Sequence, residues 1–166
     1  MTKLFFIFIT IAVVGVIVKD LFGSDFKAKK AKKFFQYKRK SFLITRAEHE
    51  FFDILVDLFG SQYHVFTQVH LPTILEHKVN GQHWKSAFSH INGKSVDFVL
   101  CDKVYIKPLL AIELDDASHE RLDRIERDSE VERMLREAEM PLLRIENKGS
   151  FDRDSIKKQI EEKLVQ

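Results

Sequence analysis

Apolar and polar residues follow first a helical and then a strand-like pattern after Thr45. Up to Gly60, apolar side chains recur every three or four residues, which is the spacing of one buried face of an α-helix. Thr45 and Glu48 form the capping-box pattern that begins such helices. Residues 63–71 (YHVFTQVHL) alternate instead, so we predict a strand that Pro72 ends. The helical positions expected to be buried are Phe51, Leu55, Leu58 and Phe59.

Two apolar runs further along the chain, VDFVL at 96–100 and LLAIELDD at 109–116, predict neighbouring strands. The charged loop between them makes a β-hairpin the expected connection. A helix is predicted over residues 118–140, and PLLRIE at 141–146 predicts a last short strand. Shorter helices are expected at 83–91 and 152–165. This order predicts an α/β fold whose mixed sheet is flanked by helices.

The N-terminal residues have a different composition. Residues 4–18 (LFFIFITIAVVGVIV) carry no charge, and as a helix they would be about 22 Å long. Lys19 can extend towards the head groups, so a single membrane span is feasible. We expect residues 1–22 to be an uncleaved anchor, with a cleaved signal peptide as the alternative.

The segment after this apolar stretch is basic. Residues 27–40 contain eight Lys or Arg and no acid, which by the positive-inside rule keeps this flank in the cytoplasm. We expect residues 23–42 to be a linker that contacts anionic lipid, or alternatively nucleic acid. A domain over residues 43–166 would then face the cytoplasm from the inner membrane.

The overall composition excludes few functions. A chain of 166 residues with 45% hydrophobic and 31% charged residues is an ordinary globular domain with at most one appendage. The net charge of +2 points to no particular class of partner. The lone cysteine, Cys101, excludes an internal disulfide framework and is expected to be buried.

Three carboxylates within the predicted hairpin are the main candidates for chemistry. Glu113 and Asp115 are two residues apart in one strand and therefore project to the same side. Asp97 can lie across from them if the two strands pair. Carboxylates this close repel one another by roughly 4 kcal/mol per pair at 4 Å. A shared proton, an arginine such as Arg144, or a cation such as Mg²⁺ can offset that repulsion.

The helix after the hairpin adds charged candidates. Its apolar stripe comprises Val131, Met134, Leu135 and Ala138. Towards the N-terminus the same stripe becomes charged at Arg124 and Arg127, with Asp128 at its edge. Such arginines could neutralise the acids or hold a phosphate. His119 follows the second strand closely and is either a surface residue or a member of the same site.

KSVDFVL, IELDDASH and PLLRI together resemble the PD-(D/E)XK, or restriction-endonuclease-like, superfamily. More narrowly, they resemble a bacterial family of uncharacterised domains allied to the very-short-patch-repair type of endonuclease. The resemblance covers about residues 41–146 and implies a core of helix, three strands, helix and strand. It also implies a metal-dependent reaction on nucleic acid.

The resemblance assigns roles to individual residues. Asp97 and Glu113 match the two motif acids, which would be Mg²⁺ or Mn²⁺ ligands. Asp115 stands where the motif usually has lysine and would be a further ligand, and His119 would assist the attacking water. The remaining candidates are Arg127 for charge stabilisation, Lys85, Lys94 and Arg124 for nucleic-acid binding, and Glu48, Gln68 and Asp128 as accessory residues.

These observations predict a membrane-tethered, Mg²⁺-dependent nuclease acting on DNA or RNA. Two alternatives keep the fold without turnover. A nucleic-acid-binding module would use the basic residues alone, and its binding would survive chelation of the metal. Trp84 and Phe88 could stack on bases in either case, although core filling is the simpler role for aromatic side chains. A membrane-associated protein-interaction module would need the acids only for stability.

Overall fold

The computed structural model describes residues 11–18, 34–116 and 122–165. The chain divides into two units, Met1–Arg39 and Lys40–Gln166, and the second unit contains the described strands. Residues 11–18 form a helix. None of the helices in the described part of the chain is long and apolar enough to cross a membrane. Of the predicted anchor, residues 1–22, the structure describes only 11–18.

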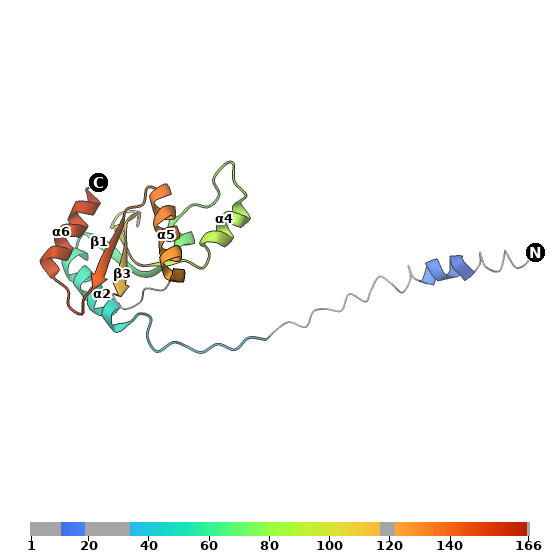
Figure 1. Cartoon of the computed structure of the whole chain (residues 1–166), viewed down its shortest axis with the longest axis horizontal. Coiled ribbons are helices and arrows are strands. Elements are labelled where there is room, and N and C mark those ends of the chain that lie inside the picture. The colour runs from blue at the N-terminus through green and yellow to red at the C-terminus, as the bar shows by residue number, and fades with distance from the viewer. Residues whose placement is uncertain (1–10, 19–33, 117–121, 166) are drawn as a thin grey trace, which may run out of the picture. The chain divides into compact units, whose positions relative to one another are not determined.

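The second unit is a mixed α/β domain (Figure 1). Its helices are α2 (Arg46–Phe59), α3 (Leu71–Ile74), α4 (Trp84–Ile91), α5 (Leu122–Glu137) and α6 (Arg153–Leu164). Its strands are β1 (Tyr63–His70), β2 (Ser95–Asp102), β3 (Pro108–Asp116) and β4 (Leu142–Asn147). They form one sheet in the order β1-β2-β3-β4, in which β3 and β4 are parallel and the other neighbours antiparallel. The predicted hairpin and mixed sheet are confirmed.

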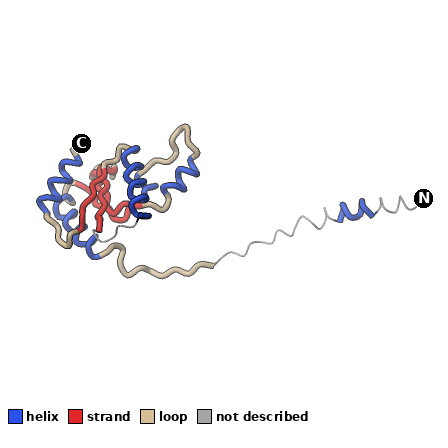
Figure 2. The backbone as a smooth tube through the Cα atoms, in the orientation of Figure 1, coloured by secondary structure: helices blue, strands red, loops and turns tan. Residues whose placement is uncertain are grey.

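Helices cover both faces of the sheet (Figure 2). On one face, α2 and α6 pack against strand residues around Phe98 and Ile112. On the other face, α4 and α5 pack against Val99 and Ala111. Because side chains alternate along a strand, β2 and β3 supply residues to both apolar clusters. These central strands are thus fixed in register from two sides, and any side chain at their ends is held by a rigid frame.

The local signals in the sequence are largely confirmed. Thr45 Oγ1 accepts from the Glu48 amide at 3.3 Å, and the Glu48 carboxylate accepts from the Thr45 amide at 2.5 Å, so the capping box is formed. Gly60 ends α2, and Cys101 is buried. Phe51, Leu55 and Phe59 are also buried.

Two boundaries differ from the prediction. β1 ends at His70, because Leu71 begins the short helix α3 with Pro72 in its first turn, where the missing amide hydrogen costs nothing. At the other end of the domain, α5 stops at Glu137, so Ala138 is exposed instead of extending the buried stripe. Leu58 is half-buried rather than buried.

Candidate active site

Asp97 and Glu113 meet at the point where the pairing of β2 with β3 ends. The Cα pairs run from Cys101–Pro108 to Phe98–Ile112, and the next residue on each strand is one of the two acids. The Glu113 side chain is among the hydrogen-bonding groups that act on the pKa of Asp97, so the two carboxyl groups lie close together. The structure therefore brings together the two acids that strand geometry predicted to be neighbours.

The main chain also takes part in holding Asp97. Asp97 Oδ2 accepts a hydrogen bond from the Leu114 amide at 2.9 Å. This bond satisfies a backbone donor beside the end of the strand pairing, where a partly buried amide would otherwise be costly. One carboxylate oxygen of Asp97 is thereby fixed relative to β3.

Gln68 and Glu48 complete this cluster from β1 and α2. The Gln68 side-chain amide donates to Asp97 Oδ1 at 3.3 Å and to Glu48 Oε1 at 2.8 Å. Glu48 therefore uses one oxygen for the capping box and the other for Gln68. The two roles considered for Glu48 are thus compatible, and Gln68 is more central than its sequence position suggested.

Gln68 adopts an unusual backbone conformation for a strand residue. Its φ is +52°, in the left-handed region, which L residues with a side chain occupy at a cost of roughly 1–2 kcal/mol. The pairs Thr67–Phe98 and Val69–Val96 on either side place it opposite Asp97. Strained residues of this kind cluster at functional sites, where surrounding contacts hold them in place.

The electrostatics of Asp97 reflect this crowding. Burial raises the pKa of its carboxyl group above the ordinary value, and the negative charge of Glu48 adds to the rise. The hydrogen bonds from Leu114, Glu113 and Gln68 oppose it without cancelling it. A partly buried carboxyl group with a raised pKa beside a second carboxyl group is an environment that a hard cation can stabilise.

Asp115 lies in a different set of contacts from this pair. Its carboxylate accepts two hydrogen bonds from Arg144 on β4, from Nε at 2.7 Å and from Nη2 at 2.5 Å. The sequence predicted that a shared proton, an arginine or a cation would offset the charge of Asp115. The structure shows the arginine. The role of Asp115 as a metal ligand stays a prediction that this ion pair opposes.

The two predicted lysines differ in their surroundings. Lys94 is only 16% exposed and bonds to Glu130 at 3.1 Å, so its charge is already matched. Lys85 lies on α4 with Nζ 5.5 Å from the centroid of the Trp84 ring, and Lys78 Nζ lies 5.9 Å from it. Trp84 is 47% exposed and Phe88 37%. About half of the Trp84 side chain is therefore exposed, so core filling is the wrong role for it. The exposed ring is in cation–π range of two lysines.

Four of the predicted residues have no described side chain. His119 lies in 117–121, outside the described ranges. Arg124, Arg127 and Asp128 belong to the helix α5, whose side chains are described only from position 129. Their roles remain predictions.

The donors around Asp97 are compatible with a cation that takes its remaining ligands from outside the protein. No group of three or more His, Cys, Asp or Glu side chains in the described ranges is placed to bind a metal ion by itself. Mg²⁺, however, usually takes one or two protein carboxylates and completes its shell with water and phosphate oxygens. Asp97 and Glu113 supply that number, and Gln68 lies beside them.

The sequence patterns identified Arg144 only as a possible ion-pair partner for the acids. It is the register partner of Glu113 in the parallel β3–β4 pair. Only the presence of a basic residue in a strand predicted to border the acids could have drawn attention to it.

Comparison with known proteins gives a family but no described activity. Neither the curated proteins nor the solved structures include a significant match to this sequence. Residues 40–164 match the family described as a protein of unknown function, DUF2726. That span is most of the chain and coincides with the second structural unit. The chain therefore belongs to the DUF2726 family.

Proposed function

We propose that this protein is a Mg²⁺-dependent nuclease that hydrolyses phosphodiester bonds in DNA or RNA. The observation that carries the proposal is the close approach of Asp97 and Glu113 at the end of the hairpin, with Gln68 and Glu48 gathered around Asp97. The resemblance to restriction-endonuclease-like domains assigns the two metal-binding acids to these positions. The element order of the domain, with its mixed sheet, is compatible with that resemblance.

The residues of the site would divide the work as follows. Asp97 and Glu113 would hold the cation, which when bound would polarise the scissile phosphate and lower the pKa of a bound water. Gln68 would keep the Asp97 carboxylate oriented through its amide. His119 would accept a proton from the attacking water, and Arg127 would stabilise the added negative charge.

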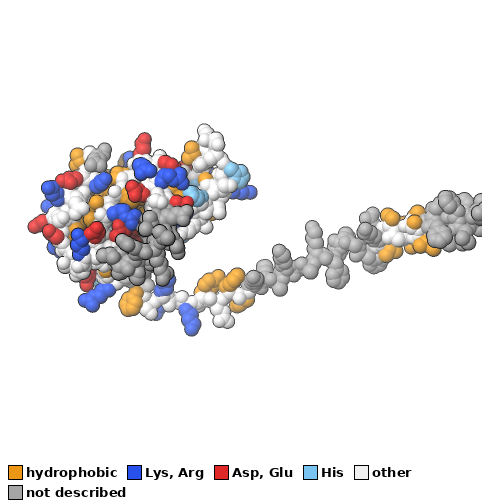
Figure 3. All heavy atoms as spheres, in the orientation of Figure 1, with side chains coloured by type: hydrophobic (Ala, Val, Ile, Leu, Met, Phe, Trp, Pro, Cys, Tyr) orange, Lys and Arg blue, Asp and Glu red, His pale blue; other side chains and the backbone are white. Residues whose placement is uncertain are grey.

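A second candidate is a nucleic-acid-binding module without turnover. The exposed Trp84 ring flanked by Lys78 and Lys85 favours it, because stacking and backbone charge are enough for binding single strands. Acidic and basic side chains are interspersed over the visible face of the domain (Figure 3). Binding would therefore depend on such local groups rather than on a uniformly basic surface.

The proposal includes a membrane tether through residues 4–22, with lipid contact at 27–40. In the described part of this stretch, Phe34 and Tyr37 are 94% and 87% exposed, next to Lys38 and Arg39. Aromatic and basic side chains together are typical of segments at an anionic membrane surface. Fractionation of cells expressing the chain with and without residues 1–22 tests this, and a protein that stays soluble in both forms would contradict it.

The test of the enzymatic proposal is a Mg²⁺ titration of the full chain in non-ionic detergent. Heat of binding and melting temperature are followed together in wild type, in Glu113→Ala and in a control, Glu146→Ala, which changes an exposed acid on β4. Saturation at a hundred times the Kd should stabilise wild type and the control by about 2.7 kcal/mol. Glu113→Ala should not respond.

A cleavage assay then separates the two candidate functions. The enzyme predicts that single- or double-stranded DNA or RNA is cut in Mg²⁺, and that chelation or Asp97→Ala abolishes cutting. The binding module predicts affinity for nucleic acid that survives both treatments. Wild type that neither binds Mg²⁺ nor cuts any of these substrates would refute the nuclease.

A further inference from the structure

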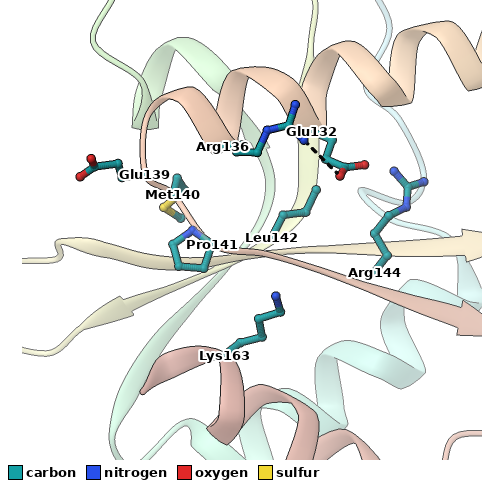
Figure 4. A pocket seen from close by; sticks show the side chains of 8 residues that line it. All are labelled: Glu132, Arg136, Glu139, Met140, Pro141, Leu142, Arg144 and Lys163. Atoms are coloured by element: carbon teal, nitrogen blue, oxygen red, sulfur yellow. Dashed lines mark ion pairs between the residues drawn. The ribbon is translucent and has the colours of Figure 1, made fainter. Parts of the chain in front are cut away.

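The ion pair between Asp115 and Arg144 places a basic group beside the two acids of the site. Glu113 and Asp115 point to the same side of β3 because they are two residues apart. The register pairs Glu113 with Arg144 on the neighbouring strand. Figure 4 shows Leu142 and Arg144 projecting from the same side of β4, towards α5. The guanidinium group thus lies on the sheet face that carries Glu113.

Stability alone is a weak explanation for this ion pair. The two side chains are 32% and 36% exposed, and ion pairs near the surface contribute little, typically below about 1 kcal/mol. What the pair does provide is geometry. Two parallel hydrogen bonds fix the plane of the Arg144 guanidinium group beside the acids.

Arg144 is also accessible from solution. It lies on the edge strand of the sheet and lines two surface hollows of about 410 and 380 Å³. The larger hollow is drawn in Figure 4, where Lys163 reaches towards it from α6 and Arg136 lies on α5. A phosphate group in either hollow could therefore reach the guanidinium without rearrangement of the core.

A cluster of carboxylates needs a positive charge nearby if a negatively charged substrate is to bind beside it. A phosphodiester is repelled by acids such as Asp97 and Glu113 in partly buried surroundings. β3 itself (PLLAIELDD) carries no basic residue whose positive charge could offset this repulsion. The adjacent strand supplies that charge through Arg144, and Asp115 is the group that holds it.

We propose that Arg144 binds the phosphate group of the nucleic-acid substrate and that Asp115 is a positioning residue for its guanidinium group rather than a metal ligand. The inference rests on the proposed function and specifies how its site neutralises substrate charge. In the reaction, Arg144 would donate hydrogen bonds to phosphate oxygens as their negative charge increases.

The experiment measures binding of fluorescently labelled DNA and RNA oligonucleotides to the full chain by anisotropy. Ca²⁺ is the cation, because it also takes oxygen ligands, and the salt concentration is varied. Losing one phosphate contact should lower the slope of log affinity against log salt by about one. Arg144→Met should show that loss and bind about tenfold more weakly. Arg136→Met, which removes another basic residue from the same hollow, is the matched control and should keep the wild-type slope.

Asp115→Asn tests the positioning role separately. Arg144 keeps its charge in this variant, so the salt slope should stay at the wild-type value while affinity falls several-fold. A purely structural ion pair would lower the melting temperature and leave both binding parameters unchanged. Arg144→Lys should keep the slope but lose part of the affinity, since a lysine cannot form the two parallel bonds. This variant decides the question if Arg144→Met does not fold.

The outcomes distinguish this inference from the proposed function. If wild type binds nucleic acid and the Arg144 variants keep its slope and affinity, the role of Arg144 is refuted and the nuclease proposal stands. If wild type shows no salt-dependent binding to either DNA or RNA, the proposed function fails, and the role of Arg144 fails with it.

Discussion

Replacing Gln68 by glycine should leave the protein more stable than replacing it by alanine, which reverses the usual order in a strand. Both substitutions remove the amide bonds to Glu48 and Asp97, so the difference between them reports the backbone alone. At φ +52° a residue with a Cβ atom is strained by roughly 1–2 kcal/mol, which glycine avoids. Glycine loses about 0.5–1 kcal/mol relative to alanine through its greater freedom when unfolded. The net expectation favours glycine by about 0.5–1 kcal/mol.

The neighbouring residue Thr67 provides the control. It lies in the same strand, paired with Phe98, and is not among the residues with positive φ. There, Thr67→Gly should be less stable than Thr67→Ala by about 0.5–1 kcal/mol. The two positions should thus differ by about 1–2 kcal/mol in their preference for glycine.

Urea unfolding of the four variants measures this difference. Comparison of midpoints is valid only where the m-value is unchanged, because a changed m-value indicates a different unfolded state. If Gln68→Gly is less stable than Gln68→Ala by the same amount as at Thr67, the backbone at Gln68 is not strained. The argument that the site holds this residue in place would then be wrong.

Three further predictions concern stability. Asp97→Asn should raise the melting temperature at pH 7, because the raised pKa of Asp97 means that its charged form is disfavoured in the folded state. The gain should shrink as the pH falls through that pKa. A gain that does not depend on pH would contradict the raised pKa of Asp97. Asp102→Ala should lower the melting temperature at pH 7. The Asp102 carboxylate accepts from the amides of Val104, Tyr105 and Lys107, and these bonds hold its pKa below the ordinary value, so the loss should disappear in acid once wild-type Asp102 is protonated. Leu55→Ala should lower the free energy of unfolding, measured in urea, by about 2–5 kcal/mol, since Leu55 is fully buried. A loss under about 1 kcal/mol would mean that the core closes around the cavity.

The sequence by itself determined the elements of the domain and one half of its candidate site. Periodicity and capping are local properties, so α2 with its capping box and the β2–β3 hairpin could be predicted from short windows. The approach of Asp97 to Glu113 followed from the hairpin, because neighbouring strands connected by a short loop have little choice of partner. For Asp115, a shared proton, an arginine and a cation were all compatible with the pattern.

Only the tertiary structure decided the other half. Gln68 is twenty positions from Glu48 and twenty-nine from Asp97 along the chain, and Asp115 is twenty-nine from Arg144. These contacts depend on which strands are neighbours, on their register and on the left-handed backbone at Gln68. A period of two or 3.6 residues records which face a side chain occupies, but it carries no information about which distant strand lies beside it. The charge of Asp115 is therefore visible in the sequence, whereas the partner that gives it a role is set by the packing of β4 against β3.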